Sequence, residues 1–270
     1  KTEEAVRHYR ASIKADPGNH LPYLNLATMH SHLGNSADAR TVVAEGLAAC
    51  VQVHELRMLE HSLKNNRTIS ACLIVKDEAT LLPGCLDSIR SWVNEIIIVD
   101  TGSNDNTVSI AMSYGANVFY QQWEGDFSKH RNFSIEQATS DWVFIIDADE
   151  RMCEEDVARL KELINSDQHS ILSINVFNVY SKSEKITTFL PSIRFFRRNL
   201  NLRYEGIVHN RLVFPENASI VRANVKIKHL GYDLSSEQMR KKFERSHALL
   251  EKQLQKNPDD AFALFNLAQL

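Results

Sequence analysis

The sequence has little cysteine, and its few cysteines lie far apart along the chain. None of them belongs to a Cys-x-x-Cys pair, so we expect no structural zinc site. Scattered single cysteines are typical of a reduced, cytosolic protein, and we therefore expect a cytoplasmic location. They are Cys50, Cys72, Cys85 and Cys153.

The chain also lacks a long apolar run. No segment approaches the ~20 apolar residues that a membrane-spanning helix needs, so we expect no membrane span. No signal peptide is visible either. However, residues 1–20 have the pattern of the middle of a helix, which indicates a piece cut from a longer protein. The missing signal peptide therefore excludes little.

Charge of one sign is not in large excess. The 31 Lys and Arg and 34 Asp and Glu give a formal net charge of −3. Neither nucleic acid nor an anionic membrane is therefore expected as a partner. The length of 270 residues, with 43% hydrophobic residues, allows one large domain or two small ones with a sizeable core.

Residues 1 to about 63 have a helical pattern that repeats. Similar residues recur at a spacing of 34 positions, which is the length of a tetratricopeptide repeat. The C-terminal end, with Pro258 followed by Leu264 and Leu267, has the same offsets. A plain helical hairpin would give part of this pattern. The pairs that define the repeat are Ala5 and Ala39, Tyr9 and Val43, and Ser12 and Gly46.

The middle of the chain alternates between short apolar segments and helical ones. Continuous apolar strands separated by helices indicate an α/β fold, with a mostly parallel sheet covered on both faces. The expected strands lie at 68–78, 94–107, 116–123 and 141–149, and the helices at 81–93, 106–115 and 127–139.

After residue 160 the alternation weakens. Residues 170–180, 192–199 and 218–232 have strand patterns, and we expect some of these strands to be antiparallel. Residues 235–257 form a long amphipathic pattern, which predicts a helix capped by Ser235 or Ser236.

Polar residues follow the parallel strands where each strand ends. They are Lys76, Asp77 and Glu78 after the first strand, Asp100 to Ser103 after the second, and Asp147 to Asp149 after the fourth. The carboxyl ends of parallel strands meet at one edge of a sheet, which is where ligands bind. We therefore expect the acids to converge on one rim.

Asp147 and Asp149 are separated by one alanine at the end of a buried strand. Because the chain bends there, both carboxylates can reach one ligand, and hard oxygen ligands suit Mg²⁺ or Mn²⁺. An acidic strand end in solvent is the plainer alternative. A haloacid-dehalogenase-type phosphatase would have Thr or Val after the pair, and a sugar-activating nucleotidyltransferase would have a glycine-rich loop after the first strand. Neither feature is present.

Four ordered segments carry a resemblance to a known family. The segments are ISACLIVKDEATLLPGCLDSI, EIIIVDTGSNDNTVSIAMSYGANV, DFSKHRNFSIEQATSDWVFIIDADE and the later HLGY. Together they resemble the family 2 glycosyltransferases with the GT-A fold, in the subgroup fused to tetratricopeptide repeats. The resemblance covers residues 68 to 232 and implies an inverting transfer of a sugar from a nucleotide diphosphate sugar.

The resemblance implies roles for residues of the donor site. Asp149 resembles the ligand of the divalent metal, and Asp147 resembles its partner at the ribose and diphosphate. The positions that match nucleotide-binding residues of the family are Glu78, Asp100, Thr101, Arg131 and Asn132. Trp123 and Phe127 are further candidates for the donor site, with core packing as the alternative for Phe127. The donor diphosphate or an anionic acceptor could also contact Arg194, Arg197 and Arg198, with a solvated strand as the alternative.

The family pattern leaves two candidates for the catalytic base. An inverting transfer needs a group that deprotonates the acceptor. Relatives have Glu where this chain has Asn210, so we expect Glu205 or His209 to act instead. His229 occupies the position of a late metal ligand in the family. Asp105 has the alternative of capping the helix that follows it.

The sequence therefore predicts three units: tetratricopeptide helices at 1–66, a GT-A domain at 67–233, and C-terminal helices that start a further repeat at 234–270. We expect a hexosyltransferase type of enzyme that uses a UDP-sugar and Mg²⁺ or Mn²⁺. The repeats suggest a protein or peptide acceptor, although a saccharide or lipid acceptor is also compatible. The rival hypothesis is a non-catalytic repeat scaffold with a degenerate transferase domain.

Overall fold

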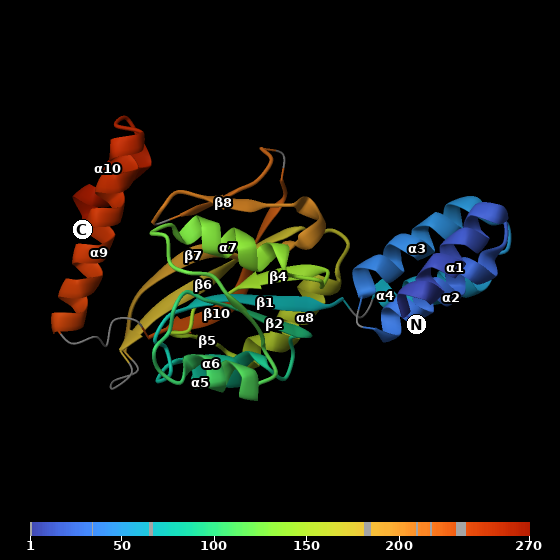
Figure 1. Cartoon of the computed structure of the whole chain (residues 1–270), viewed down its shortest axis with the longest axis horizontal. Coiled ribbons are helices and arrows are strands. Elements are labelled where there is room, and N and C mark those ends of the chain that lie inside the picture. Colours follow the sequence, from blue (N-terminus) through green and yellow to red (C-terminus); the bar gives the residue numbers. More distant parts are fainter. Residues whose placement is uncertain are drawn as a thin grey trace.

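The computed structural model describes residues 2–33, 35–64, 67–180, 185–208, 210–216, 218–230 and 236–270. In these residues a central sheet has the strand order β3-β2-β1-β4-β7-β6-β10-β5, and a small second sheet pairs β8 with β9. Helices lie on both faces of the central sheet, and helical units lie at its two ends (Figure 1).

The first half of the sheet is parallel. Strands β3, β2, β1 and β4 run in the same direction, which confirms the predicted mostly parallel sheet in this part of the chain. Runs of Ile and Val favour these strands because β-branched side chains pack well on a pleated surface. The strands are β1 (Ile69–Val75), β2 (Glu95–Asp100), β3 (Asn117–Tyr120) and β4 (Trp142–Ile145), and the helices between them are α5 (Leu82–Ile89), α6 (Thr107–Ser113) and α7 (Phe127–Glu136).

The second half is largely antiparallel. β7 pairs antiparallel with β4 and β6, while β10 pairs parallel with β6 and antiparallel with β5. The expected antiparallel strands are thus confirmed. A strand at 150–152 was not predicted. The elements are β5 (Glu150–Met152), η1 (Glu154–Asp156), α8 (Val157–Asn165), β6 (Ile171–Tyr180), β7 (Lys185–Arg197), η2 (Arg198–Leu200), β8 (Arg203–Glu205), β9 (Arg211–Val213) and β10 (Ile220–His229).

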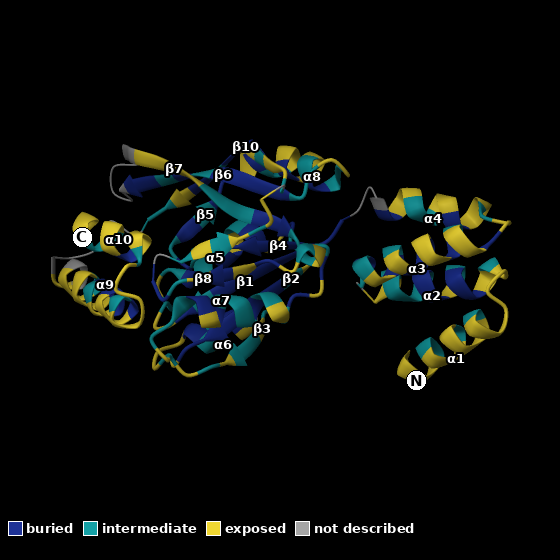
Figure 2. Ribbon diagram, turned by 90° about the horizontal axis from the view of Figure 1, so that it is seen from above, coloured by how far each residue is buried: buried dark blue, intermediate teal, exposed yellow. Residues whose placement is uncertain are grey.

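The core lies on both faces of the sheet because successive side chains of a strand point to opposite sides. In β1, Ala71 and Leu73 face α5 and α6, while Cys72 faces α7. Phe144 of β4 and Phe195 of β7 stack with their ring centroids 4.1 Å apart. Figure 2 shows the buried residues concentrated in these strands.

The N-terminal helices form a separate small core. Its fully buried residues include Leu26, Ala39 and Val42, and Tyr23 and Gly46 lie where the helices approach closely. Ala39, Val43 and Gly46, which the 34-residue spacing singled out, are all buried. The helices are α1 (Thr2–Ala15), α2 (His20–His32), α3 (Ser36–Ala49) and α4 (His54–Lys64).

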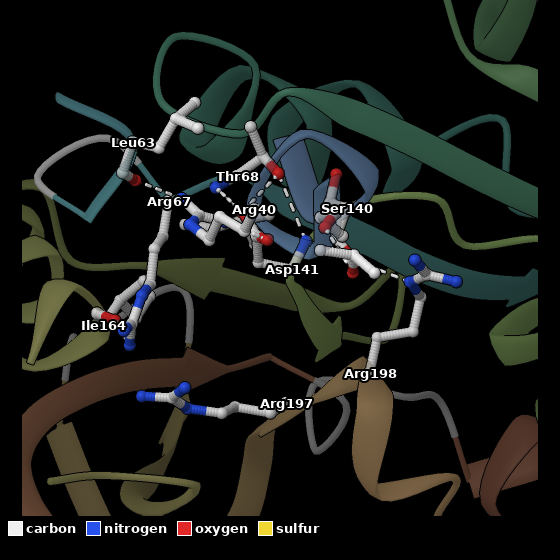
Figure 3. Close-up of polar contacts among 12 residues, drawn as sticks. Arg40, Leu63, Arg67, Thr68, Ser140, Asp141, Ile164, Arg197 and Arg198 are labelled. Carbon is white, nitrogen blue, oxygen red and sulfur yellow. Dashed lines mark hydrogen bonds and ion pairs between the residues drawn. The ribbon is translucent and has the colours of Figure 1, made fainter. Parts of the chain in front are cut away.

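Ion pairs and hydrogen bonds join these helices to the amino ends of the parallel strands. Arg40 of α3 forms an ion pair with Asp141, which immediately precedes β4. Asp141 also accepts hydrogen bonds of 2.8 Å from the backbone N–H and the hydroxyl of Thr68, just before β1. Arg67 donates to the carbonyl oxygen of Ile164 at 3.0 Å. Figure 3 shows this arginine-rich junction, at the edge of the sheet opposite the carboxyl ends.

The C-terminal helices lie at the other end of the sheet (Figure 1). They are α9 (Ser236–Lys256) and α10 (Ala261–Gln269), which begins at a cap where Asp260 accepts from the N–H groups of Phe262 and Ala263. The cap predicted at Ser235 or Ser236 lies outside the residues whose side chains are described. Among the described helices, none is long and apolar enough to cross a membrane.

Gly46 gives a test of the helix packing. A Cβ at this position would lie 2.9 Å from Cβ of Tyr23 and 2.9 Å from Cδ1 of Leu56. Gly46→Ala should therefore lower the free energy of unfolding by about 1–3 kcal/mol through overpacking. Helix propensity alone would raise it by about 1 kcal/mol. Chemical denaturation followed by circular dichroism measures the sign, and a gain in stability would contradict the close packing.

Candidate active site

A cavity of about 460 Å³ opens at the carboxyl ends of β1, β2 and β4. It brings together most of the predicted donor-site residues, so the expected rim of acids is found here. Its lining comprises Ile74, Val75, Lys76, Glu78, Thr101, Trp123, Phe127, Arg131, Asp147, Ala148, Asp149, His229, Lys242 and Arg245.

Asp147 is held between two arginines. Nη2 of Arg131 donates to both of its carboxylate oxygens, at 2.9 and 3.2 Å, and Nη1 of Arg194 lies 3.7 Å away. Burial alone would raise the pKa of Asp147, but the two guanidinium groups hold it below the usual range. The Asp147 carboxylate is therefore charged and fixed in orientation, while 37% of the side chain stays exposed.

Glu150 contacts both Asp147 and Arg194 and is almost fully buried. One of its oxygens pairs with Nη2 of Arg194 at 2.5 Å, and the other accepts from the N–H of Asp147 at 2.9 Å. Burial raises the pKa of Glu150 to about 7, against the opposing effect of Arg194. Glu150 thus ties the turn after β4 to β7.

Arg151 fixes the same turn from the other side. Its guanidinium donates to the carbonyl oxygens of Ala148 at 2.9 Å and Leu81 at 2.6 Å. Gly84 leaves the space that this side chain needs, because a Cβ there would lie 2.6 Å from Nε of Arg151. The residue between the two aspartates is therefore anchored through its backbone.

Strand pairing brings Asp149 and His229 together. β5 begins directly after Asp149 and pairs with β10, so that His229 lies opposite Glu150. Nε2 of His229 lies 3.1 Å from Oδ2 of Asp149, and Nδ1 lies 2.7 Å from Oδ1 of Asn178. Burial lowers the pKa of His229, but the hydrogen bond to Asp149 and the negative charges of Asp149 and Glu150 together raise the pKa overall.

This pair fits a divalent cation. Carboxylate and imidazole are common ligands of Mn²⁺-type ions, and Mg²⁺ usually keeps only one or two protein carboxylates beside waters and phosphates. Within the described stretches, no group of three or more His, Cys, Asp and Glu is arranged to hold a metal by itself. A cation here would therefore depend on oxygens of a bound ligand as well as on Asp149 and His229.

Glu78 and Thr101 form the wall at the ends of β1 and β2. Burial, Asp149 and Asp147 together raise the pKa of Glu78 to about 7. The hydroxyl of Thr101 donates to the carbonyl oxygen of Val75 at 3.1 Å, which joins the two strand ends. Trp123 and Phe127, with ring centroids 4.7 Å apart, complete the apolar part of the lining.

Asp100 has a different environment from the one that its predicted role suggested. Its carboxylate accepts from the N–H groups of Gly102 and Ser103, so it closes the loop after β2. It also lines a neighbouring cavity of about 470 Å³ that shares Lys76, Thr101 and Trp123 with the first. Asp105 accepts from the Thr107 N–H at 2.9 Å, as expected of a helix cap.

Other predicted residues lie outside the cavity lining. Asn132 exchanges two hydrogen bonds with the backbone of Tyr204, at 2.7 and 2.9 Å, and so anchors β8 to α7. Glu205 is exposed and lies 3.9 Å from Arg211. His209 falls outside the described residues. Arg197 and Arg198 donate to backbone carbonyls at the amino edge of the sheet.

The sequence interpretation missed several residues that the structure brings to the site. Glu150 and Arg151 directly follow the aspartate pair, and this position was the available signal. Arg194 was a candidate with a solvated strand as the alternative, and only 13% of its side chain is exposed in the structure. Lys242 and Arg245 lie far along the chain on α9. Their spacing of three residues, which places both side chains on one face of a helix, was the signal in the sequence.

Comparison with known families assigns both parts of the chain. The model of "Glycosyl transferase family 2" matches residues 70–213, and that of "Tetratricopeptide repeat" matches residues 8–41. Both resemblances that the sequence carried are thereby confirmed.

Individual relatives carry one or the other of these two descriptions in their names. A "TPR repeat-containing protein" of Synechococcus elongatus is 34% identical, over 75% of this chain and 52% of its own length. The prophage-derived glycosyltransferase SunS of Bacillus subtilis is 31% identical, over 73% of this chain and 48% of its own. The chain thus spans about half the length of both. The crystal structure of S. aureus TarS with UDP matches at 17% identity with a TM-score of 0.46, over 75% of this chain and 70% of that one.

Arg194 tests the charged cluster beneath the site. Removing its guanidinium leaves Glu150 buried and unpaired, so Arg194→Met should lower the free energy of unfolding by about 3–5 kcal/mol. The double variant Arg194→Met/Glu150→Gln should recover much of this loss, because the uncompensated charge is then gone. Urea denaturation of the wild type and the three variants measures both effects. Equal losses in the single and double variants would contradict the pairing.

Proposed function

Because the chain belongs to glycosyltransferase family 2, we propose that it is an inverting, metal-dependent glycosyltransferase. It moves a sugar, of the hexose type, from a nucleotide diphosphate sugar to an acceptor. The observation that carries this proposal is the cavity at the strand ends. There His229 lies within hydrogen-bond distance of Asp149, and Arg131 donates to Asp147. UDP-sugars are the first donors to test.

The two aspartates have different tasks in this proposal. Asp149 and His229 would hold Mg²⁺ or Mn²⁺, which supplies a Lewis acid to the departing diphosphate when it is bound. Asp147 is charged and fixed by Arg131 and Arg194, and it would face the ribose and the diphosphate of the donor. A charged group that is already oriented needs no rearrangement during the reaction, which favours catalysis.

The nucleoside would lie beside Glu78 and Thr101. Both residues line the cavity at the ends of neighbouring strands, and Thr101 also lines the second cavity, with Asp100. Trp123 adds an aromatic surface that the two cavities share. Asn132 acts on this site indirectly in our proposal, because its hydrogen bonds hold β8 against α7.

The acceptor is proposed to be a protein or peptide that the repeat helices hold. Helices of this type present concave surfaces to partners. α9 and α10 lie at the same edge of the sheet as the cavity, whereas α1–α4 lie at the opposite edge (Figure 1). The proposal keeps the three units expected from the sequence, 1–66, 67–233 and 234–270. The cytoplasmic location stays a prediction.

Asp149 tests the reaction. Asp149→Asn keeps the shape of the side chain but removes its charge, so Mn²⁺-dependent binding and slow hydrolysis of nucleotide sugars should fall by at least about 100-fold. Calorimetry and product detection with a panel of nucleotide sugars measure this, with Asp87→Asn on the exposed face of α5 as the matched control. If the native protein binds no nucleotide sugar with any metal, the scaffold hypothesis replaces the enzyme.

The catalytic base is tested separately. Glu205→Gln and His209→Asn each remove one candidate base, and Glu205 does not belong to the cavity lining. One of them should lower kcat by about 100- to 10,000-fold, the usual contribution of a general base, with unchanged donor affinity. Steady-state kinetics with a transferable donor decides between them. Full activity in both variants would show that neither residue is the base.

A further inference from the structure

Helix α9 contributes two cations to the cavity. Lys242 and Arg245 both belong to its lining, and they lie three residues apart, on one face of the helix. The whole helix, Ser236–Lys256, follows the segment 70–213 that matches the glycosyltransferase family. These two residues are therefore an addition to the site that the family match does not cover.

Arg245 lies against the apolar part of the lining. Its guanidinium carbon is 5.6 Å from the ring centroid of Phe127, the first residue of α7. An arginine over an aromatic face keeps its charge while its stem packs, so its donors can still face the cavity. The charge of Arg245 also acts to lower the pKa of Glu78, on the wall formed by β1, against the larger effects that raise it. Arg245 thus lines the cavity from the side of α9.

The position of α9 is fixed by polar contacts. Oε1 of Gln253 accepts from the Ile207 N–H at 2.8 Å, and Nε2 of the same residue donates to Asp260 at 2.9 Å. Nζ of Lys252 donates to the carbonyl oxygen of Glu124 at 3.4 Å. These contacts lie about two turns beyond Arg245. They hold the helix against the loops before α7 and after β8.

Apolar contacts strengthen the same docking. Leu249 and Leu250 of α9 form a buried cluster with Ile207 and Val208. Trp123 and Phe127, which also line the cavity, pack against this cluster. α9 is therefore packed in place as one wall of the cavity.

The charges of the cavity show why two more cations matter. The strand ends supply three acids, Glu78, Asp147 and Asp149, and one cation, Lys76, while Arg131 is engaged by Asp147. A nucleoside diphosphate brings at least two further negative charges, which additional cations beside a divalent metal would stabilise. Lys242 and Arg245 supply such cations from the side of α9.

We propose that Lys242 and Arg245 bind the diphosphate of the donor and of the nucleotide product, so that helix α9 forms the cationic half of the donor site. This inference rests on the proposed function, because it takes a nucleotide diphosphate sugar as the ligand. Guanidinium and ammonium groups are the usual partners of phosphate oxygens. A sugar transfer leaves the diphosphate with an additional negative charge, which both groups stabilise as it departs.

The experiment compares nucleoside diphosphates with the matching nucleosides. Binding of UDP, GDP and dTDP, and of uridine, guanosine and thymidine, is measured by calorimetry with Mn²⁺. Lys242→Met and Arg245→Met remove the charge but keep an unbranched apolar stem. Arg240→Met and Lys241→Met on the same helix are the matched controls, because their side chains are 65% and 67% exposed and pair with Glu244 and Glu237. Thermal unfolding checks that α9 stays folded.

Each of the two variants should weaken binding of the preferred diphosphate about 10- to 100-fold, as expected for a lost charge-assisted contact. Nucleoside affinity and both control variants should be unchanged, and Arg245→Lys should retain part of the affinity. If Asp149→Asn abolishes diphosphate binding while Lys242→Met and Arg245→Met leave it unchanged, the α9 assignment is wrong and the proposed function stands. If the native protein binds no nucleoside diphosphate, both fail together.

Discussion

The ion cluster around Asp147 allows the carboxyl edge of the sheet to carry its acids. Arg131 comes from α7, Arg194 from β7 and Glu150 from the start of β5, so three separate elements meet at one carboxylate. Without the two guanidinium groups, three neighbouring acids would repel one another in a partly buried site. The orientation of Asp147, the turn that positions Asp149 and the pairing of β5 with β10 all depend on this cluster.

The two helical units have different relations to this edge. α1–α4 are joined to the amino ends of the strands through Arg40, Arg67 and Asp141, far from the cavity (Figures 1 and 3). α9 and α10 lie at the carboxyl ends, and α9 completes the cavity wall. A polypeptide that contacts both units would have to pass along the whole sheet. The chain thus places one helical unit beside the cavity and the other remote from it.

Local patterns in the sequence were sufficient for much of the fold. Buried runs such as that of 96–99 can only form strands between two covered faces, and the parallel half of the sheet followed from them. Gly46 and Ala39 were recognised because close helix packing restricts residue size at a fixed period. The family resemblance supplied the expected metal and nucleotide positions, and the structure brings Glu78, Thr101, Arg131, Asp147, Asp149 and His229 to one cavity.

What the sequence did not reveal depends on contacts between distant segments. Arg194 kept a solvated strand as its alternative because nothing near it in the chain indicates that it pairs with Glu150. Asn132 and Asp100 have family positions, yet their side chains are engaged by backbone groups of β8 and of the loop after β2. Lys242 and Arg245 belong to a helix with an ordinary charged surface, and only its docking at Ile207 and Glu124 brings them to the site.

The central claim is that the carboxyl-edge cavity binds a nucleoside diphosphate together with a metal. A crystal structure of the chain with Mn²⁺ and UDP, with the metal located by its anomalous scattering, tests it most directly. We predict one Mn²⁺ bonded to Asp149 and to diphosphate oxygens, with the nucleoside beside Thr101. A nucleotide bound at the amino edge near Arg40, or a metal site that excludes Asp149, would contradict the account.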